Sequence, residues 1–367
     1  MSEGRDSPAA GKAPGKATRL LHKADKLQQR RPFLAVAFGT YKKFSDDQAG
    51  YLAALIAYYG FASLFPLLLV LVTILGLVAS GDPGLRADAL DAVAKQIPLI
   101  GQQLTGNVHE LRQSSIIGLI IGMAVLIWGT SRLAQAGIFT MEQVWNLPGP
   151  ARPGYVPRLG RAGTFLGVLG LGVIATTGLA ALDAFGQHSL PFIVASTALA
   201  MVVNAGMYLI AFRVLTPAGI SWRQLVPGAA AGGVAWTVLQ VGGTYLVRHS
   251  LHTSAVYGVF ATVLGLLAWV YLAVEVTVYA AEINVVLDRR LWPRSVVQPP
   301  LTEADRVSMA LQALQNQRRA EQIVDVTFND RPPGTPAGES TPRRAEDILG
   351  QKPTEDGRPD KDEDKAG

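Results

Sequence analysis

Six long apolar runs, nearly free of charged side chains, constrain the fold of this chain more than any other feature. A helix rises 1.5 Å per residue, so a run of this length can cross roughly 30 Å of hydrocarbon. Buried helices of a soluble protein usually keep a polar face, which these runs lack. The sequence therefore predicts an all-α, polytopic membrane helical bundle with about six transmembrane helices. The runs occupy about residues 51–79, 116–137, 160–182, 191–214, 225–247 and 256–284.

The composition supports this class of protein and excludes others. Only 17% of the 367 residues are charged, whereas a soluble domain has about 25%. The low share is expected of a membrane protein, because a charged side chain at a lipid-facing position costs free energy. Cysteine is absent, which excludes disulfide scaffolds and thiolate metal sites. The sequence contains no P-loop, GxSxG or HExxH motif, and its five histidines are scattered along the chain. We therefore expect no enzymatic activity, no metal site and no cofactor.

The placement of lysine and arginine predicts how the runs thread through the membrane. Basic residues are concentrated before the first run, between the second and third, between the fourth and fifth, and after the sixth. The alternate loops hold far fewer. Because basic segments stay on the cytoplasmic side, we expect a multi-pass protein of the bacterial cell (inner) membrane with both termini in the cytoplasm.

The chain divides into three parts. Residues 1–32 form a polar, basic leader that we expect to be disordered. Residues 33–290 form the six-helix membrane domain. Residues 291–367 form a cytoplasmic tail, with one short helix between 302 and 322 followed by disorder.

Local patterns add detail to the membrane domain. Residues 33–44 have apolar side chains at helical spacing, which predicts a short amphipathic helix that lies in the headgroup region or packs on the rest of the protein. Ser45 and Gln48 have the spacing of a capping box for the helix that follows. Pro66, in the first run, predicts a helix kink. Residues 81–114 are polar enough to leave the bilayer and predict two short amphipathic helices.

Glycines at a four-residue spacing predict close contacts between helix backbones. Such pairs matter in lipid, because lipid offers no hydrophobic drive for helix association. The pairs are Gly118–Gly122, Gly163–Gly167 and Gly228–Gly232.

Ionisable and polar side chains inside the apolar runs are the candidate site residues. Tyr271, Glu275 and Glu282 share one helix face, because they are four and seven residues apart. An unpaired charge at such depth is expensive, so these groups should face the bundle interior or water. Either the arginines pair with the glutamates and hold the bundle together, or the groups line a polar cavity open to the cytoplasm. The candidates are Arg132, Asn204, Arg213, Tyr271, Glu275 and Glu282, with Asn204 also a candidate for an interhelical hydrogen bond.

Several stretches resemble the YihY/virulence factor BrkB family of bacterial inner-membrane proteins, over roughly residues 33–290. They are Ala53–Tyr59 with Ser63–Leu67, Trp222–Ala229, and Tyr257–Gly258 with Trp269–Leu272 and Ala281–Asn284. The resemblance implies a six-helical fold and a link to envelope lipid export. Some members carry a tRNA-processing ribonuclease label, but the metal-ligand cluster that such an enzyme needs is missing here. Glu275 stands where the family pattern implies an apolar or small residue.

Three hypotheses about function follow. The first is transport or flipping of a lipid-like or amphiphilic substrate, with Arg132 and Arg213 attracting an anionic lipid headgroup and Glu275 setting the charge of the cavity. The second is a non-transporting membrane scaffold for envelope proteins. The third is an RNA-processing enzyme. We expect membrane lipids as partners and no nucleic acid, because attraction to anionic lipids explains the basic leader.

Overall fold

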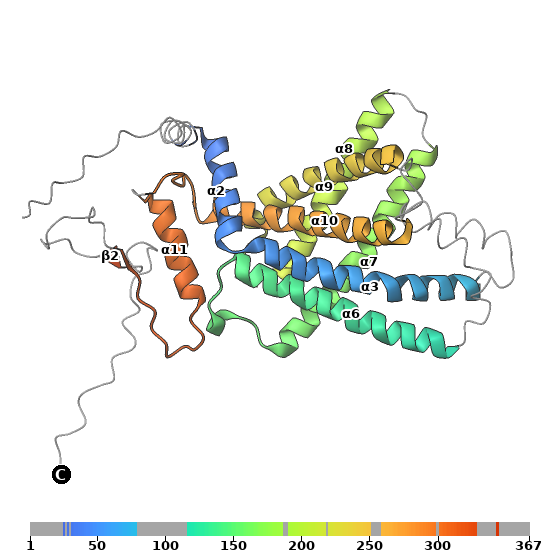
Figure 1. The fold of residues 1–367 in the computed structure, drawn as a ribbon, viewed down its shortest axis with the longest axis horizontal. Helices are drawn as coiled ribbons and strands as arrows, with labels where there is room; N and C mark the ends of the chain where they lie inside the picture. The colour runs from blue at the N-terminus through green and yellow to red at the C-terminus, as the bar shows by residue number, and fades with distance from the viewer. Residues whose placement is uncertain are drawn as a thin grey trace, which may run out of the picture.

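The structure is a computed structural model, which describes residues 25, 28, 31–78, 116–185, 190–217, 219–250, 258–298, 301–328 and 343–344. Six long helices of 26 to 31 residues form its body (Figure 1). They confirm the predicted all-α membrane bundle and coincide with the six apolar runs. Their bounds are α3 Ala49–Val78, α6 Ile116–Val144, α7 Tyr155–Phe185, α8 Leu190–Leu215, α9 Trp222–Ser250 and α10 Gly258–Asp288.

The six helices close into a ring. Each packs against its neighbour in the order α3, α6, α7, α8, α9 and α10, and α10 returns to α3. Three stretches within the described residues are long and apolar enough to cross a membrane: Ala49–Leu67 in α3, Val194–Leu215 in α8 and Val263–Asp288 in α10. Helix α3 continues through Pro66, and a kink there stays a prediction.

Helix α2 (Pro32–Asp46) precedes the bundle and confirms the predicted amphipathic helix. Pro32 occupies its first turn, where the missing N–H costs no hydrogen bond. One face of α2 packs against α10 and buries Ala35, Gly39 and Lys43, whereas Phe33 on the other side is 81% exposed. The helix thus packs on the protein and still presents aromatic surface.

The predicted capping box at Ser45 is wrong. Ser45 lies inside the last turn of α2, and the chain turns at Gln48, which has a φ of 53°. Helix α3 then begins at Ala49. Sequence spacing missed this because α2 extends beyond the apolar residues that define it.

Two of the long helices end in the same kind of turn. Asn146 follows α6 with a φ of 48°, and Arg290 follows α10 with a φ of 52°. In each case the next N–H bonds back over five residues, from Leu147 to the carbonyl of Glu142 and from Leu291 to that of Val286. This is the Schellman arrangement, which satisfies carbonyls that a helix end would leave unpaired.

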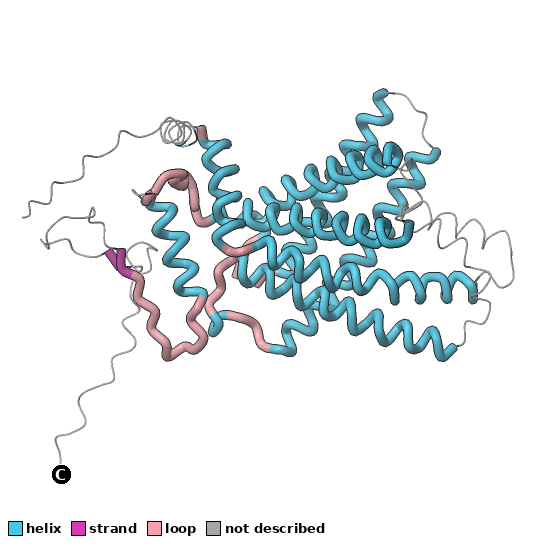
Figure 2. Tube along the Cα trace, in the orientation of Figure 1, coloured by secondary structure: helices cyan, strands magenta, loops and turns pink. Residues whose placement is uncertain are grey.

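One end of the bundle gathers most of the described loops (Figure 2). It comprises α2, the link 145–154, the described residues 216–217 and 219–221, the segment 289–298 and helix α11 (Glu303–Gln315). We call it the basic end, because it carries the described lysines and arginines of the segments that predicted the membrane orientation. The link 145–154 holds the short helix η3 (Gly149–Ala151). The loops that join the helices elsewhere, including residues 81–114, and most of the leader and the final tail lie outside the described residues.

Helix α11 confirms the predicted helix of the tail, although it ends at Gln315. Its N-terminus carries a capping box in which Thr302 and Asp305 exchange hydrogen bonds. Farther along, the two-residue strands β1 (Thr327–Phe328) and β2 (Arg343–Arg344) pair in antiparallel fashion.

Glycine lets α9 approach α10 closely. A Cβ added at Gly228 would lie 2.0 Å from the carbonyl oxygen of Ala280, and one at Gly232 would lie 3.0 Å from the Ala280 Cβ. The Gly228–Gly232 pair therefore makes the predicted contact. At Gly163 and Gly167 an added Cβ meets no described atom within 4 Å, so that pair makes no such contact with the described part of the chain.

Candidate functional site

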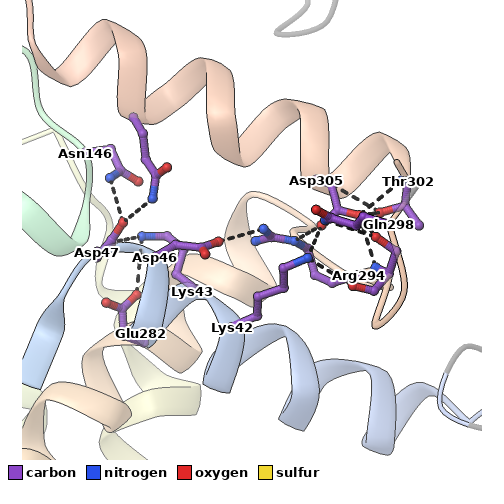
Figure 3. A network of polar contacts seen from close by, with 12 residues as sticks. Lys42, Lys43, Asp46, Asp47, Asn146, Glu282, Arg294, Gln298, Thr302 and Asp305 are labelled. Carbon is purple, nitrogen blue, oxygen red and sulfur yellow. Dashed lines mark hydrogen bonds and ion pairs between the residues drawn. The ribbon is translucent and has the colours of Figure 1, made fainter. Parts of the chain in front are cut away.

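A buried lysine joins α2 to α10 at the basic end (Figure 3). The side chain of Lys43 is fully buried, and its Nζ lies 3.3 Å from Oε2 of Glu282, which is fully buried as well. The same ammonium forms a salt bridge with Asp47 one turn later and donates a hydrogen bond of 2.9 Å to the carbonyl of Val144. One lysine thus compensates two carboxylates and also binds the end of α6.

The pKa of Lys43 reflects this arrangement. Burial by itself would lower the pKa, but the carboxylates of Glu282 and Asp47 raise it above the usual value for lysine. Lys43 therefore stays protonated at physiological pH, and its charge is a permanent part of the site.

Asp47 extends the network to α11. Its carboxylate accepts hydrogen bonds from Asn146 at 3.4 Å and from Gln312 at 3.0 Å. Asn146 also donates to Gln315 at 2.9 Å. The left-handed residue that ends α6 therefore links α11 to the junction between α2 and α3.

A second buried pair fastens the segment after α10. Arg294, which is fully buried, donates from Nε to Asp305 at 2.6 Å and from a terminal nitrogen to Asp46 at 2.7 Å. Lys42 adds a salt bridge to Asp305 at 2.9 Å, and the Ser295 hydroxyl donates to it at 2.5 Å. This pair holds the start of α11 against α2 (Figure 3).

The environment of Asp305 favours its charged form. Burial would raise the pKa of this carboxyl, but hydrogen bonds from Ser295, Lys42 and Arg294 outweigh burial and hold the pKa far below its ordinary value. Asp305 is thus the anionic centre of the second pair.

An open groove lies beside this network, between α2, the start of α3, and α10. Its volume is about 540 Å³, and we call it the aromatic groove. Phe44 and Tyr279 stack in it with ring centroids 3.9 Å apart and planes 4° apart. Tyr41 and Tyr51 are 61% and 77% exposed. The lining residues are Tyr41, Phe44, Ser45, Gln48, Gly50, Tyr51, Ala54, Tyr271 and Tyr279.

Glu275 lies close to this groove. It is half-buried and occupies the middle of the Val263–Asp288 stretch of α10. Tyr271 and Tyr279 lie one turn to either side, so all three share a helix face, and the Glu275 carboxylate acts electrostatically on both phenols. Within the described residues, Glu275 forms no ion pair with a lysine or arginine.

The two candidate arginines lie elsewhere. Arg132 is exposed on α6, with its guanidinium 5.8 Å from the ring centre of Trp128. Arg213 donates to the carbonyl of Ile220 at 3.1 Å and lies 5.6 Å from the ring centre of Trp222. In the described part of the chain, neither arginine forms an ion pair with Glu275 or Glu282.

Asn204 takes the simpler of its two predicted roles. It is buried on α8 and donates a hydrogen bond of 3.1 Å to the Thr237 hydroxyl of α9. The structure therefore places Tyr271 in the groove lining, Glu275 on the same face of α10 between two lining tyrosines, and Glu282 in the ionic network. The described contacts of Arg132 and Asn204 are with Trp128 and Thr237 instead.

Sequence reasoning missed Lys43, Arg294 and Asp305. In the sequence, Lys43 is one of the basic residues before the first apolar run, and these predict only the orientation. A signal was present, because Lys43 follows Ala35 and Gly39 at intervals of four, which places it on the face of α2 that packs most closely. Asp305 has a different signal, since Thr302 and Asp305 have the spacing of a capping box, but no sequence pattern pairs Asp305 with Arg294. Among the described residues there is no group of histidine, aspartate and glutamate side chains that could hold a metal ion.

Comparison with known proteins gives one family. The family model for virulence factor BrkB matches residues 40–303. No solved structure matches the chain.

Three curated relatives are similar to this chain at low identity. The inner membrane protein YhjD of Escherichia coli is 23% identical over 280 residues, which cover 70% of this chain and 82% of that protein. A UPF0761 membrane protein of Alcanivorax borkumensis is 22% identical over 66% of this chain, and one of Stenotrophomonas maltophilia is 24% identical over 68%. The matched regions span only 58% and 60% of those two proteins. None of these names states an enzymatic activity.

Proposed function

The chain belongs to the virulence factor BrkB family of integral inner-membrane proteins, and from that premise we propose that it transports or flips a lipid-like or amphiphilic substrate. The observation that carries this proposal is the aromatic groove. An open groove of about 540 Å³ beside a membrane-spanning helix has the size of a small-molecule site.

The chemistry of the groove suits an amphiphile. Tyrosine has an apolar ring and a polar hydroxyl, and it is enriched where hydrocarbon meets water. Tyr41 and Tyr51 present such side chains at the mouth of the groove, and Ser45 and Gln48 add polar groups. An acyl chain can contact the rings while a headgroup meets the polar atoms.

The proposal includes an orientation. We place the basic end on the cytoplasmic side, because the described basic segments lie on it. Both termini then lie in the cytoplasm, as the sequence predicts. The substrate then enters from the cytoplasmic leaflet, and movement of α3 about Pro66 opens its path. The buried pairs Lys43–Glu282 and Arg294–Asp305 hold α2 and α11 in place during this movement.

Reconstitution tests this function. The purified protein is placed in liposomes that contain a fluorescent phospholipid, and the accessibility of the inner leaflet to dithionite is measured. We expect faster loss of fluorescence than in protein-free liposomes, and a slower rate for Glu275→Gln. Leu272→Ala, on an exposed position of α10 outside the groove, is the matched control and should keep the wild-type rate. If wild-type protein moves no lipid, the proposal fails.

A second candidate function, a non-transporting scaffold, is favoured by the way polar groups pair. Asn204, Arg213 and Glu282 all have partners inside the protein, and α11 is fastened to the bundle by buried charges. A scaffold predicts no lipid movement in the liposome assay. It also predicts a cellular phenotype when α11 is released by Asp305→Asn but none for Glu275→Gln.

A further inference from the structure

We propose that the aromatic groove and Glu275 together bind the alkylammonium headgroup of the amphiphile. This inference rests on the proposed function and names the class of substrate that it would act on.

The groove offers the surface that an organic cation prefers. Five of its lining side chains are aromatic, and the faces of aromatic rings attract cations through their quadrupole. The parallel stack of Phe44 on Tyr279 fixes one wall, while Tyr41 and Tyr51 are exposed at the mouth. Groups of this kind recognise alkylammonium ions in proteins without needing hydrogen bonds.

The charge of the site points in the same direction. Glu275 is half-buried inside a candidate spanning helix. No ion pair of the described residues includes it. A lone charge at this depth is expensive. A ligand cation between Tyr271 and Tyr279 would compensate it, since Glu275 lies one turn from each.

The lysines nearest to the groove in sequence already form salt bridges within the protein. Lys43 is bound by Glu282 and Asp47, and Lys42 by Asp305. The described lining of the groove contains no lysine or arginine. An anionic headgroup, which Arg132 and Arg213 were expected to attract, would find neither arginine here, because each lies over a tryptophan elsewhere on the bundle.

Calorimetric titration of the full-length protein in lipid nanodiscs tests this assignment. The probe is hexyltrimethylammonium below its micelle concentration, compared with hexanol as the neutral analogue and hexyl phosphate as the anionic one. We expect the wild type to bind the cation at least about tenfold more tightly than either analogue. Hexylammonium, titrated in parallel, shows whether the site prefers a quaternary or a primary ammonium headgroup.

Three variants separate the contributions. Glu275→Gln should weaken binding of the cation about tenfold or more, because it removes the charge without changing the shape. Tyr51→Leu, an exposed position, should weaken it about two- to fivefold. Tyr58→Leu is the matched control, since Tyr58 is an exposed tyrosine of α3 outside the groove lining, and it should bind like the wild type.

The inference is overturned if hexyl phosphate or hexanol binds as well as the cation. It is also overturned if both Glu275→Gln and Tyr51→Leu bind the cation like the wild type. Lipid movement in liposomes without any preference for the cation would retain the proposed function and reject only this inference. Binding of the cation without lipid movement would reject the proposed function and retain the assignment of the groove as a cation site.

Discussion

Replacing Lys43 by methionine should destabilise the protein severely. Methionine has a similar length but no charge, so the substitution leaves the fully buried Glu282 and the neighbouring Asp47 without a counter-charge. Breaking a buried ion pair by removing one partner typically costs about 3–5 kcal/mol. The loss of the hydrogen bond to the Val144 carbonyl adds to this. We expect a total loss of about 5 kcal/mol in the free energy of unfolding.

A double variant distinguishes lost charge compensation from general damage to packing. Lys43→Met combined with Glu282→Gln removes both charges of the pair, and Asp47 keeps its hydrogen bonds from Asn146 and Gln312. The double variant should therefore recover about 2 kcal/mol relative to Lys43→Met alone. The measurement is reversible unfolding by SDS in mixed micelles. A loss below about 1 kcal/mol for Lys43→Met, or costs that simply add in the double variant, would refute the reasoning.

Three further predictions concern other contacts of the structure. Because the pKa of Asp305 is held below its ordinary value of 3.8, the stability that this carboxylate contributes is present above about pH 4 and is lost as the pH falls further. The protection of α11 against hydrogen exchange, corrected for the intrinsic exchange rate, should fall over that range in the wild type and be low already at pH 7 in Asp305→Asn. Gly228→Ala should cost about 1–3 kcal/mol in the free energy of unfolding, because the added Cβ meets the Ala280 carbonyl. Gly163→Ala, whose added Cβ meets no described atom within 4 Å, should cost none. Arg290→Gly should raise the free energy of unfolding by up to about 1 kcal/mol, since Arg290 has a φ of 52° that glycine adopts without strain; a loss of stability there would show that the Arg290 side chain makes a stabilising contact.

The six long helices could be predicted because their signal is local. An apolar run of more than twenty residues has few alternatives to a spanning helix, whatever its neighbours are. The contact at Gly228 and the helix of the tail were also visible in the sequence as spacing patterns. The helix ends were harder to predict from the sequence. Asn146 and Arg290 end α6 and α10 through left-handed turns, and neither turn contains a glycine that would mark it.

The ionic network could not be predicted, because it depends on how distant segments pack. The sequence marks Glu282 as an ionisable residue of a span, but its partner Lys43 lies in a different helix, near the opposite end of the domain's sequence. The partners expected for it were arginines, and these lie over Trp128 and Trp222 instead. Periodicity shows which face a residue occupies and leaves open which helix covers that face.

The rate at which a single cysteine in the groove reacts tests the account most directly. The chain contains no cysteine, so Ser45→Cys introduces one reactive thiol into the groove lining. We predict that a membrane-impermeant maleimide labels it in inverted membrane vesicles but not in intact cells, and that hexyltrimethylammonium slows the labelling. Labelling from the periplasmic side, or a rate that the amphiphile leaves unchanged, would contradict a cytoplasm-facing groove that binds an amphiphilic cation.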